Sequence, residues 1–266
     1  MEEKTEGMNT KATEKKEPEA TDKVGIEFDD EKEHVLNREN WKGQKVNLLG
    51  GSLRLQNDID PEVSVVGARL IYDGFSAFLS DQQKQNIDNA TIGSSISFSD
   101  CWMNGTIEFT KPTELYIDKS AFDCIVFDPS KEHQDLSGKY PMEIADGTII
   151  DQLIVGVNGY CGVNCGYVDD SDTPVRINHL VVRGAADLVL CNVGHLVVER
   201  LGAAEVHGEV SHICVSGTLF IAPSGSVGSI HLHAGGRIYG KIQNIDIESD
   251  RPYRIVEEDG DTWILG

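Results

Sequence analysis

A six-residue pattern of apolar and polar positions recurs through the second half of the chain. Its first, fourth and sixth positions are apolar, and its third is polar or cysteine. The segments that share the pattern are FDCIVF from Phe122, IDQLIV from Ile150, INHLVV from Ile177, VGHLVV from Val193, VSHICV from Val210, VGSIHL from Val227 and IQNIDI from Ile242. Their starts lie 28, 27, 16, 17, 17 and 15 residues apart, so the last five segments form a repeat of nearly constant length.

This pattern predicts short β-strands joined by a bend. Alternating apolar and polar residues are typical of a strand with one buried face, whereas an amphipathic helix would repeat every three or four residues. The step of three between Val210 and Ile213 breaks the alternation, and both side chains can face inward only if the chain turns a corner between them. We therefore predict an all-β, single-stranded β-solenoid (β-helix) with coils of 15–17 residues, in which Val193, Val210 and Val227 lie directly above one another.

The prediction divides the chain into three parts. Residues 1–35 combine many charges with few apolar side chains and should form a disordered acidic tail. Residues 36–250 should form the solenoid, with about ten coils and a length of roughly 50 Å at one strand spacing per coil. Within it, the segment SDQQKQNID from Ser80 is expected to be a loop or a short helix. Residues 251–266 should form a C-terminal cap, with Trp263 and Ile264 over the last coil.

The same register predicts further columns. Val189, Val206, Pro223 and Ile238 each stand four residues before the start of a segment, so we expect them to stack. Cys191 stands two residues before a start, where the following coils carry glycine, and should be a small core residue. Cys214 lies between two inward-facing residues and should point outward.

Three histidines occupy the third position of the pattern in consecutive coils. The column they form, the histidine column, contains Cys124, Gln152, His179, His195, His212, Ser229 and Asn244. Imidazole and thiolate groups are good zinc ligands, but side chains stacked in one column run parallel, whereas tetrahedral coordination needs them to converge. We therefore interpret the column as a structural ladder, and expect neither a metal site nor another cofactor.

The two longest intervals exceed one coil by about eleven residues. We predict inserts at 128–141 and 158–174 that leave after the second strand of the pattern, and therefore from the same corner of adjacent coils. Stacked loops of this kind commonly carry binding sites. The candidate binding residues are the aromatic and acidic side chains of the inserts, namely Tyr140, Tyr160, Tyr167, Asp169 and Asp170.

The net charge narrows the range of partners. Lys and Arg number 23 against 44 Asp and Glu, which gives a formal net charge of −21. Nucleic acids and anionic membrane surfaces are bound through basic patches, so neither is an expected partner. No apolar run is long enough to be inserted across a membrane, and the start of the chain lacks a hydrophobic signal segment. These features favour a cytoplasmic location, with a virion or the cell surface as alternatives.

The coil sequence resembles that of a known family. The unit G-x-V-x-G-x-V-x-x-V-x-V, read at 236–247 and nearly at 204–215, is similar to the coils of bactofilins, which are bacterial cytoskeletal β-solenoids with disordered charged tails. That resemblance implies end-to-end polymerisation. The inserts, the irregular first half and the cap depart from the family and argue against an open-ended polymer. The repeat also resembles the passenger coils of autotransporters and the solenoids of phage tails.

Our leading hypothesis is a non-enzymatic structural or binding scaffold whose faces or loops contact a protein or glycan partner. Self-assembly into a homo-oligomer is left open. The alternative is a carbohydrate-active β-helix enzyme, a glycoside hydrolase or polysaccharide lyase, with its site at the two inserts. Two carboxylates about 5–10 Å apart in a groove lined by tyrosines would favour that alternative.

Overall fold

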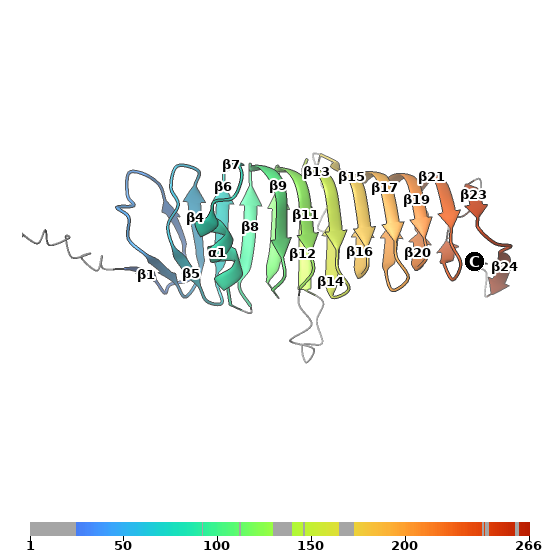
Figure 1. Ribbon diagram of the computed structural model, residues 1–266, viewed down its shortest axis with the longest axis horizontal. Helices are drawn as coiled ribbons and strands as arrows, with labels where there is room; N and C mark the ends of the chain where they lie inside the picture. The colour runs from blue at the N-terminus through green and yellow to red at the C-terminus, as the bar shows by residue number, and fades with distance from the viewer. Residues whose placement is uncertain are drawn as a thin grey trace, which may run out of the picture.

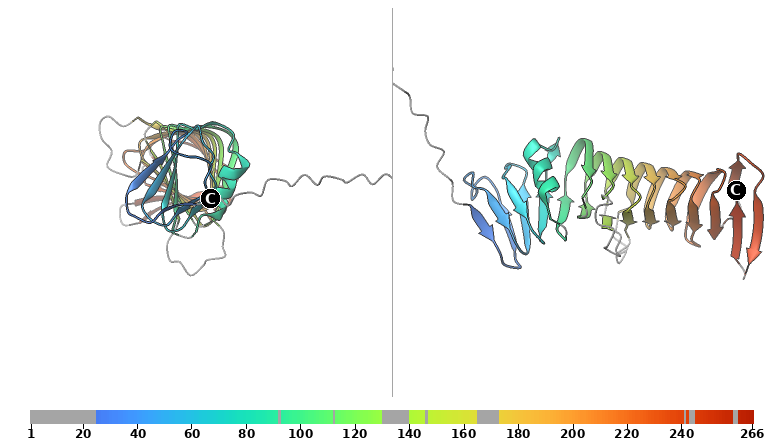
Figure 2. Two further views of the ribbon diagram at one scale, coloured as in Figure 1. Left: turned by 90° about the vertical axis from the view of Figure 1, so that its left-hand side faces the viewer. Right: turned by 60° about the horizontal axis from the view of Figure 1, so that its bottom comes forward.

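The predicted fold class is confirmed. A computed structural model describes residues 25–266 except 92, 112, 130–139, 146, 165–172, 241, 243–244 and 259–260. In this part of the chain the fold is an all-β parallel solenoid of about ten turns with one short helix (Figure 1). Seen end on, the strands wrap around a common axis (Figure 2).

One side of the rod is a 13-stranded sheet. Its strands in spatial order are β2 (Glu33–Leu36), β4 (Ser52–Gln56), β6 (Arg69–Asp73), β8 (Ser95–Ser99), β10 (Glu114–Asp118), β12 (Tyr140–Ala145), β14 (Gly159–Val163), β16 (Ala185–Leu188), β18 (Ala203–Val206), β20 (Thr218–Ile221), β22 (Arg237–Gly240), β25 (Asp261–Leu265) and β24 (Arg254–Glu258). Pairing is parallel from β2 to β22, and β25 and β24 then add as antiparallel strands.

The remaining strands form a nine-stranded and a three-stranded sheet. The larger contains β7 (Ser76–Ala77), β9 (Trp102–Phe109), β11 (Ala121–Phe127), β13 (Ile149–Val155), β15 (Val175–Val182), β17 (Cys191–Val198), β19 (Glu209–Val215), β21 (Ser226–Leu232) and β23 (Asp246–Ser249). The smaller contains β1 (Ile26–Phe28), β3 (Val46–Leu48) and β5 (Val63–Val65). Strands β1 and β2 already pair with the solenoid, which therefore begins about ten residues before the boundary predicted at residue 36.

The predicted columns of the long strands are confirmed. Val210 pairs with Val193 on one side and with Val227 on the other. Pairing lapses one residue later, between Gly194 and Ser211, and resumes at His195 and His212. This lapse marks the corner that the step of three predicted. The apolar side chains on both sides of the corner fill one continuous core, and their burial in stacked coils stabilises the rod.

Two register predictions are wrong. Ile230 pairs with Ile247 rather than Ile245, because the last coil keeps the 17-residue spacing and the alternating sequence IDI satisfies the pattern at either residue. Val206 stacks between Leu188 and Ile221 rather than between Val189 and Pro223. The turns between the strands differ in length from coil to coil. The register that holds on one side of the rod therefore does not hold on another.

The C-terminal end departs from the coil geometry. Strand β25 runs antiparallel to β22, and β24 folds back on β25 as a hairpin. Ile264 is buried in the core, and the Trp263 ring stacks on Tyr239 with 4.4 Å between centroids. Within the described residues, no helix is long and apolar enough to span a bilayer.

Candidate functional site

The predicted insert site remains a prediction. Tyr167, Asp169 and Asp170 lie outside the described residues, as does the side chain of Tyr140, whose backbone begins β12. Tyr160 is half-buried in β14, where it pairs with Pro141 of the preceding coil and Ala185 of the following one.

The bounds predicted for the second insert are wrong. Residues 159–163 form β14, and Cys161 within it is fully buried in the core. The undescribed segment 130–139 stands between β11 and β12, whereas 165–172 stands between β14 and β15. Strands β11 and β14, which precede these segments in the chain, belong to different sheets, so the prediction that both inserts follow the same strand of the coil is wrong. The long interval misled because it contains a short, glycine-containing strand of its own.

The solenoid is interrupted at one coil by helix α1 (Asp81–Asn89). The helix begins at Ser80, whose hydroxyl accepts from the Gln83 backbone N–H while the Gln83 side chain accepts from the Ser80 N–H. Along the chain, β5 is followed by β6, α1 by β8, and β9 by β10. Strands β6, β8 and β10 are neighbours in the 13-stranded sheet, in that order. Helix α1 therefore stands where a strand would lie between β5 and the second half of β9.

The helical segment provides hydrogen-bond partners for the backbone at the edge of β5. Asn86 is buried, and its side-chain oxygen accepts from the Val63 N–H at 3.0 Å while its amide donates to the Pro61 carbonyl at 2.9 Å. The Thr91 N–H, just beyond the helix, donates to the Val65 carbonyl at 3.0 Å. Polar groups of the helical segment thus replace the missing strand on this side.

Among the described residues, the facing edge of β9 has no such replacement. Strand β7 pairs with β9 only at Trp102 and Met103. In the described part of the chain, no strand pairs with residues 106–109 on the side that faces α1. The Phe109 carbonyl accepts from Asp128 on the opposite side, so the alternation of a parallel strand turns the N–H and carbonyl of Glu108 toward the helix.

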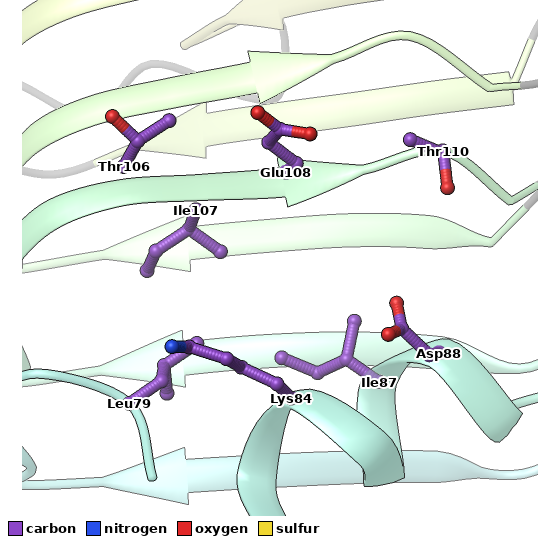
Figure 3. A pocket seen from close by; sticks show the side chains of 8 residues that line it. All are labelled: Leu79, Lys84, Ile87, Asp88, Thr106, Ile107, Glu108 and Thr110. Atoms are coloured by element: carbon purple, nitrogen blue, oxygen red, sulfur yellow. The ribbon is translucent and has the colours of Figure 1, made fainter. Parts of the chain in front are cut away.

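A pocket of about 360 Å³ lies along this edge (Figure 3). Its lining is Leu79, Lys84, Ile87, Asp88, Thr106, Ile107, Glu108 and Thr110. Leu79, Ile87 and Ile107 are each at most 6% exposed and give the pocket an apolar floor, whereas the charged residues are exposed at its rim. The Lys111 ammonium donates to the Asp88 carbonyl and ties the end of the helix to the end of β9.

Two large aromatic side chains are exposed beside this interruption. Phe78 is 72% exposed and Trp102 is 70% exposed. Phe78 lies two residues before the N-cap Ser80, and its ring packs over Gly105 of β9, where an added Cβ would lie 3.2 Å from the ring. Trp102 begins β9. Aromatic side chains are common anchors of protein interfaces.

The histidine column is confirmed from Cys124 through to Ser229, and its next place is taken by Asp246 instead of Asn244. Its side chains do not all run parallel, however. The rings of His195 and His212 lie 5.1 Å apart at 34°, and both approach Cys214, which is half-buried and outward-facing as predicted.

Sequence reasoning missed both the β9 edge and the approach of Cys214 to the histidine column. The first depends on where the helix falls within a coil, which the blurred repeat before residue 120 did not reveal. The second had a signal, because His212 and Cys214 are two residues apart and so share one face of a strand. Searches of known protein families, curated proteins and solved structures found no match to this chain.

Proposed function

We propose that this chain is a non-enzymatic scaffold that binds an extended segment of a partner protein at the α1 interruption. The observation that carries the proposal is the open edge of β9 beside an apolar pocket. Backbone donors and acceptors at strand spacing are matched by another extended polypeptide, which would pair with β9 on the side that faces α1.

The side chains around the edge indicate which residues the partner segment should carry. The apolar floor accepts one aliphatic side chain of the added strand, and Phe78 and Trp102 offer exposed anchors nearby. Asp88 and Glu108 place carboxylates at the rim, and the chain as a whole carries a net charge of −21. The partner segment is therefore extended, with alternating aliphatic and basic residues.

The C-terminal hairpin supports a rod of finite length. End-to-end growth of a parallel solenoid needs the last coil to offer free parallel edges, and β25 occupies the edge of β22 in antiparallel orientation. The proposed scaffold thus works through its side, and the polymerisation implied by the bactofilin resemblance is not part of it.

Fluorescence anisotropy with a defined peptide tests the proposal. The probe is a short, dye-labelled, end-blocked peptide of alternating valine and lysine. Its controls are the same peptide N-methylated at every second residue, and a peptide of alternating valine and glutamate. We expect the lysine peptide to bind, the N-methylated peptide to bind about tenfold more weakly through loss of main-chain hydrogen bonds, and the glutamate peptide to bind more weakly through repulsion.

A matched pair of variants locates the binding. Glu108→Pro removes the N–H that faces α1 and leaves the hydrogen bonds to β11 in place, because proline is tolerated at an open strand edge. Glu108→Ala removes the carboxylate and keeps the N–H. The proline variant should bind the lysine peptide about fivefold more weakly than the alanine variant, with unchanged circular dichroism. Equal binding by the two variants, or equal binding of the N-methylated peptide, would refute strand addition.

A further inference from the structure

We propose that His195, His212 and Cys214 form a binding site for a divalent transition metal of the zinc class. The site belongs to β17 and β19 and is independent of the peptide-binding edge at β9. His195 and His212 are paired across adjacent coils, and Cys214 stands two residues after His212 on the same outward face.

The donor atoms have the separations that a tetrahedral ion requires. The Cys214 Sγ lies 3.5 Å from the Nε2 of His195 and 3.6 Å from the Nε2 of His212. All three donor atoms fall within 4.8 Å of one another. With Zn–N and Zn–S bonds of about 2.05 and 2.3 Å, two ligands at a tetrahedral angle stand about 3.6 Å apart. An ion can therefore bind with only small shifts of these side chains.

A hydrogen bond orients one of the ligands. The Nδ1 of His212 lies 2.8 Å from the Ser229 hydroxyl on the next coil. When the Nδ1–H donates to that oxygen, the lone pair of the ring is on Nε2, which is the atom that faces Cys214. A partner on the second ring nitrogen is the usual support of a metal-bound histidine.

Binding changes the protonation of Cys214 and leaves the neighbouring His231 with its own partner. Metal ions bind the thiolate form of cysteine, so binding displaces the thiol proton of Cys214 and releases it to solvent. His231 pairs with Cys214 on the next coil, but its Nε2 is held by Asp250 at 2.8 Å.

Three protein ligands leave one coordination position open. A nitrogen–nitrogen–sulfur set suits zinc and other borderline ions better than magnesium or calcium, which prefer oxygen ligands. The fourth position faces outward with the half-exposed side chains, and we assign it to water or to a ligand from solution. The bound ion would also link β17 to β19.

Cobalt titration of the full chain tests this site. The protein is reduced, stripped of metal with a chelator, and titrated with Co²⁺, whose thiolate charge-transfer and d–d absorption bands report sulfur ligation and tetrahedral geometry. We expect the thiolate band to saturate at a single equivalent and to disappear when Zn²⁺ displaces the cobalt. Competition with a chromophoric chelator then gives the zinc affinity.

Four variants separate this trio from its neighbours, with circular dichroism confirming that each is folded. Cys214→Ser should abolish the thiolate band, His195→Ala should weaken zinc binding by roughly 100-fold, and Ser229→Ala should weaken it by about tenfold through loss of orientation. His179→Ala changes an exposed histidine of the same column and should leave the affinity unchanged. The proposal fails if wild-type protein gives no thiolate band, if the band survives Cys214→Ser, or if His179→Ala costs as much as His195→Ala.

Discussion

Replacement of Val210 by aspartate would place a carboxylate in the middle of the core. Val210 is 2% exposed and lies between Val193 and Val227. Loss of the buried aliphatic side chain costs about 2 kcal/mol. Burial raises the pKa of a carboxyl group by about 3–5 units, so at pH 7 neutralising it costs about 4 kcal/mol more. The total of about 6 kcal/mol is comparable with the whole stability of many domains.

The pH dependence separates the charge from the lost packing. Because the folded-state pKa of the new aspartate is raised, the variant loses stability as pH rises above the unfolded value of about 4 and regains it as pH falls. Val210→Asn has nearly the same shape without a charge, so its free energy of unfolding should lack this dependence. The two variants should differ by about 4 kcal/mol near pH 7 and converge near pH 4.

Two tryptophans near opposite ends of the rod report how far along it the loss of stability extends. Trp263 stacks on Tyr239 at the C-terminal end, and Trp41 is held near the N-terminal end by a hydrogen bond from its Nε1 to the Gln44 carbonyl. Urea titration followed by fluorescence reads each end separately when only one tryptophan remains, in a Trp41→Phe/Trp102→Phe background for the C-terminal end and a Trp102→Phe/Trp263→Phe background for the N-terminal end. Since each coil contacts only its neighbours, Val210→Asp should lower the midpoint reported by Trp263 much more than that reported by Trp41. Equal stability of the aspartate and asparagine variants at pH 7, or equal shifts at both tryptophans, would refute this reasoning.

Three further predictions concern the turns, the helix and the C-terminal end. Gly240→Ala should lower the free energy of unfolding in urea titration by about 3 kcal/mol, because φ of Gly240 is +101° and a Cβ would lie 2.2 Å from a carbonyl oxygen of the neighbouring coil. Gly67→Ala should lower it by only about 1 kcal/mol, because φ of Gly67 is +59° and a Cβ there would meet open space. Asn86→Ala should cost about 2–4 kcal/mol in the same assay, because it leaves two backbone groups at the edge of β5 without partners. A hydrogen bond to the carboxylate of Asp250 raises the pKa of His231, so the ion pair should be present below that pKa, while Asp250 stays ionised, and be lost as pH rises through it. Asp250→Asn should lower the pKa of His231 in an NMR titration, and an unchanged value would contradict the pairing.

The repeat alone was enough to predict the solenoid, because columns of inward residues such as Val193, Val210 and Val227 depend only on local spacing and strand geometry. It could not predict the register of every side, because the lengths of the turns vary independently of the strands. Residues 245–247 show the limit, since an alternating IDI sequence satisfies the pattern in two positions. The interruption at α1 was harder still, because the consequence of a helix depends on which strand it displaces.

The candidate chemistry was predicted in part. The order of the histidine column followed from sequence, whereas the approach of Cys214 to His195 crosses from one column to its neighbour and depends on how the side chains tilt. Repeats identify which residues lie above one another, but they contain little information on diagonal contacts between coils. A diagonal pair of His and Cys, two residues and one coil apart, is therefore not found from the repeat alone.

The helix also has a mechanical consequence. The 13-stranded sheet passes α1 without a break through β6, β8 and β10, whereas the opposing pairing between β5 and β9 is missing there. Resistance to flexing is consequently uneven around the circumference, and thermal bending should concentrate at this coil, about a single hinge plane. A strand paired with the open edge of β9 would stiffen the hinge. Binding at this one coil would therefore increase the persistence length of the entire rod.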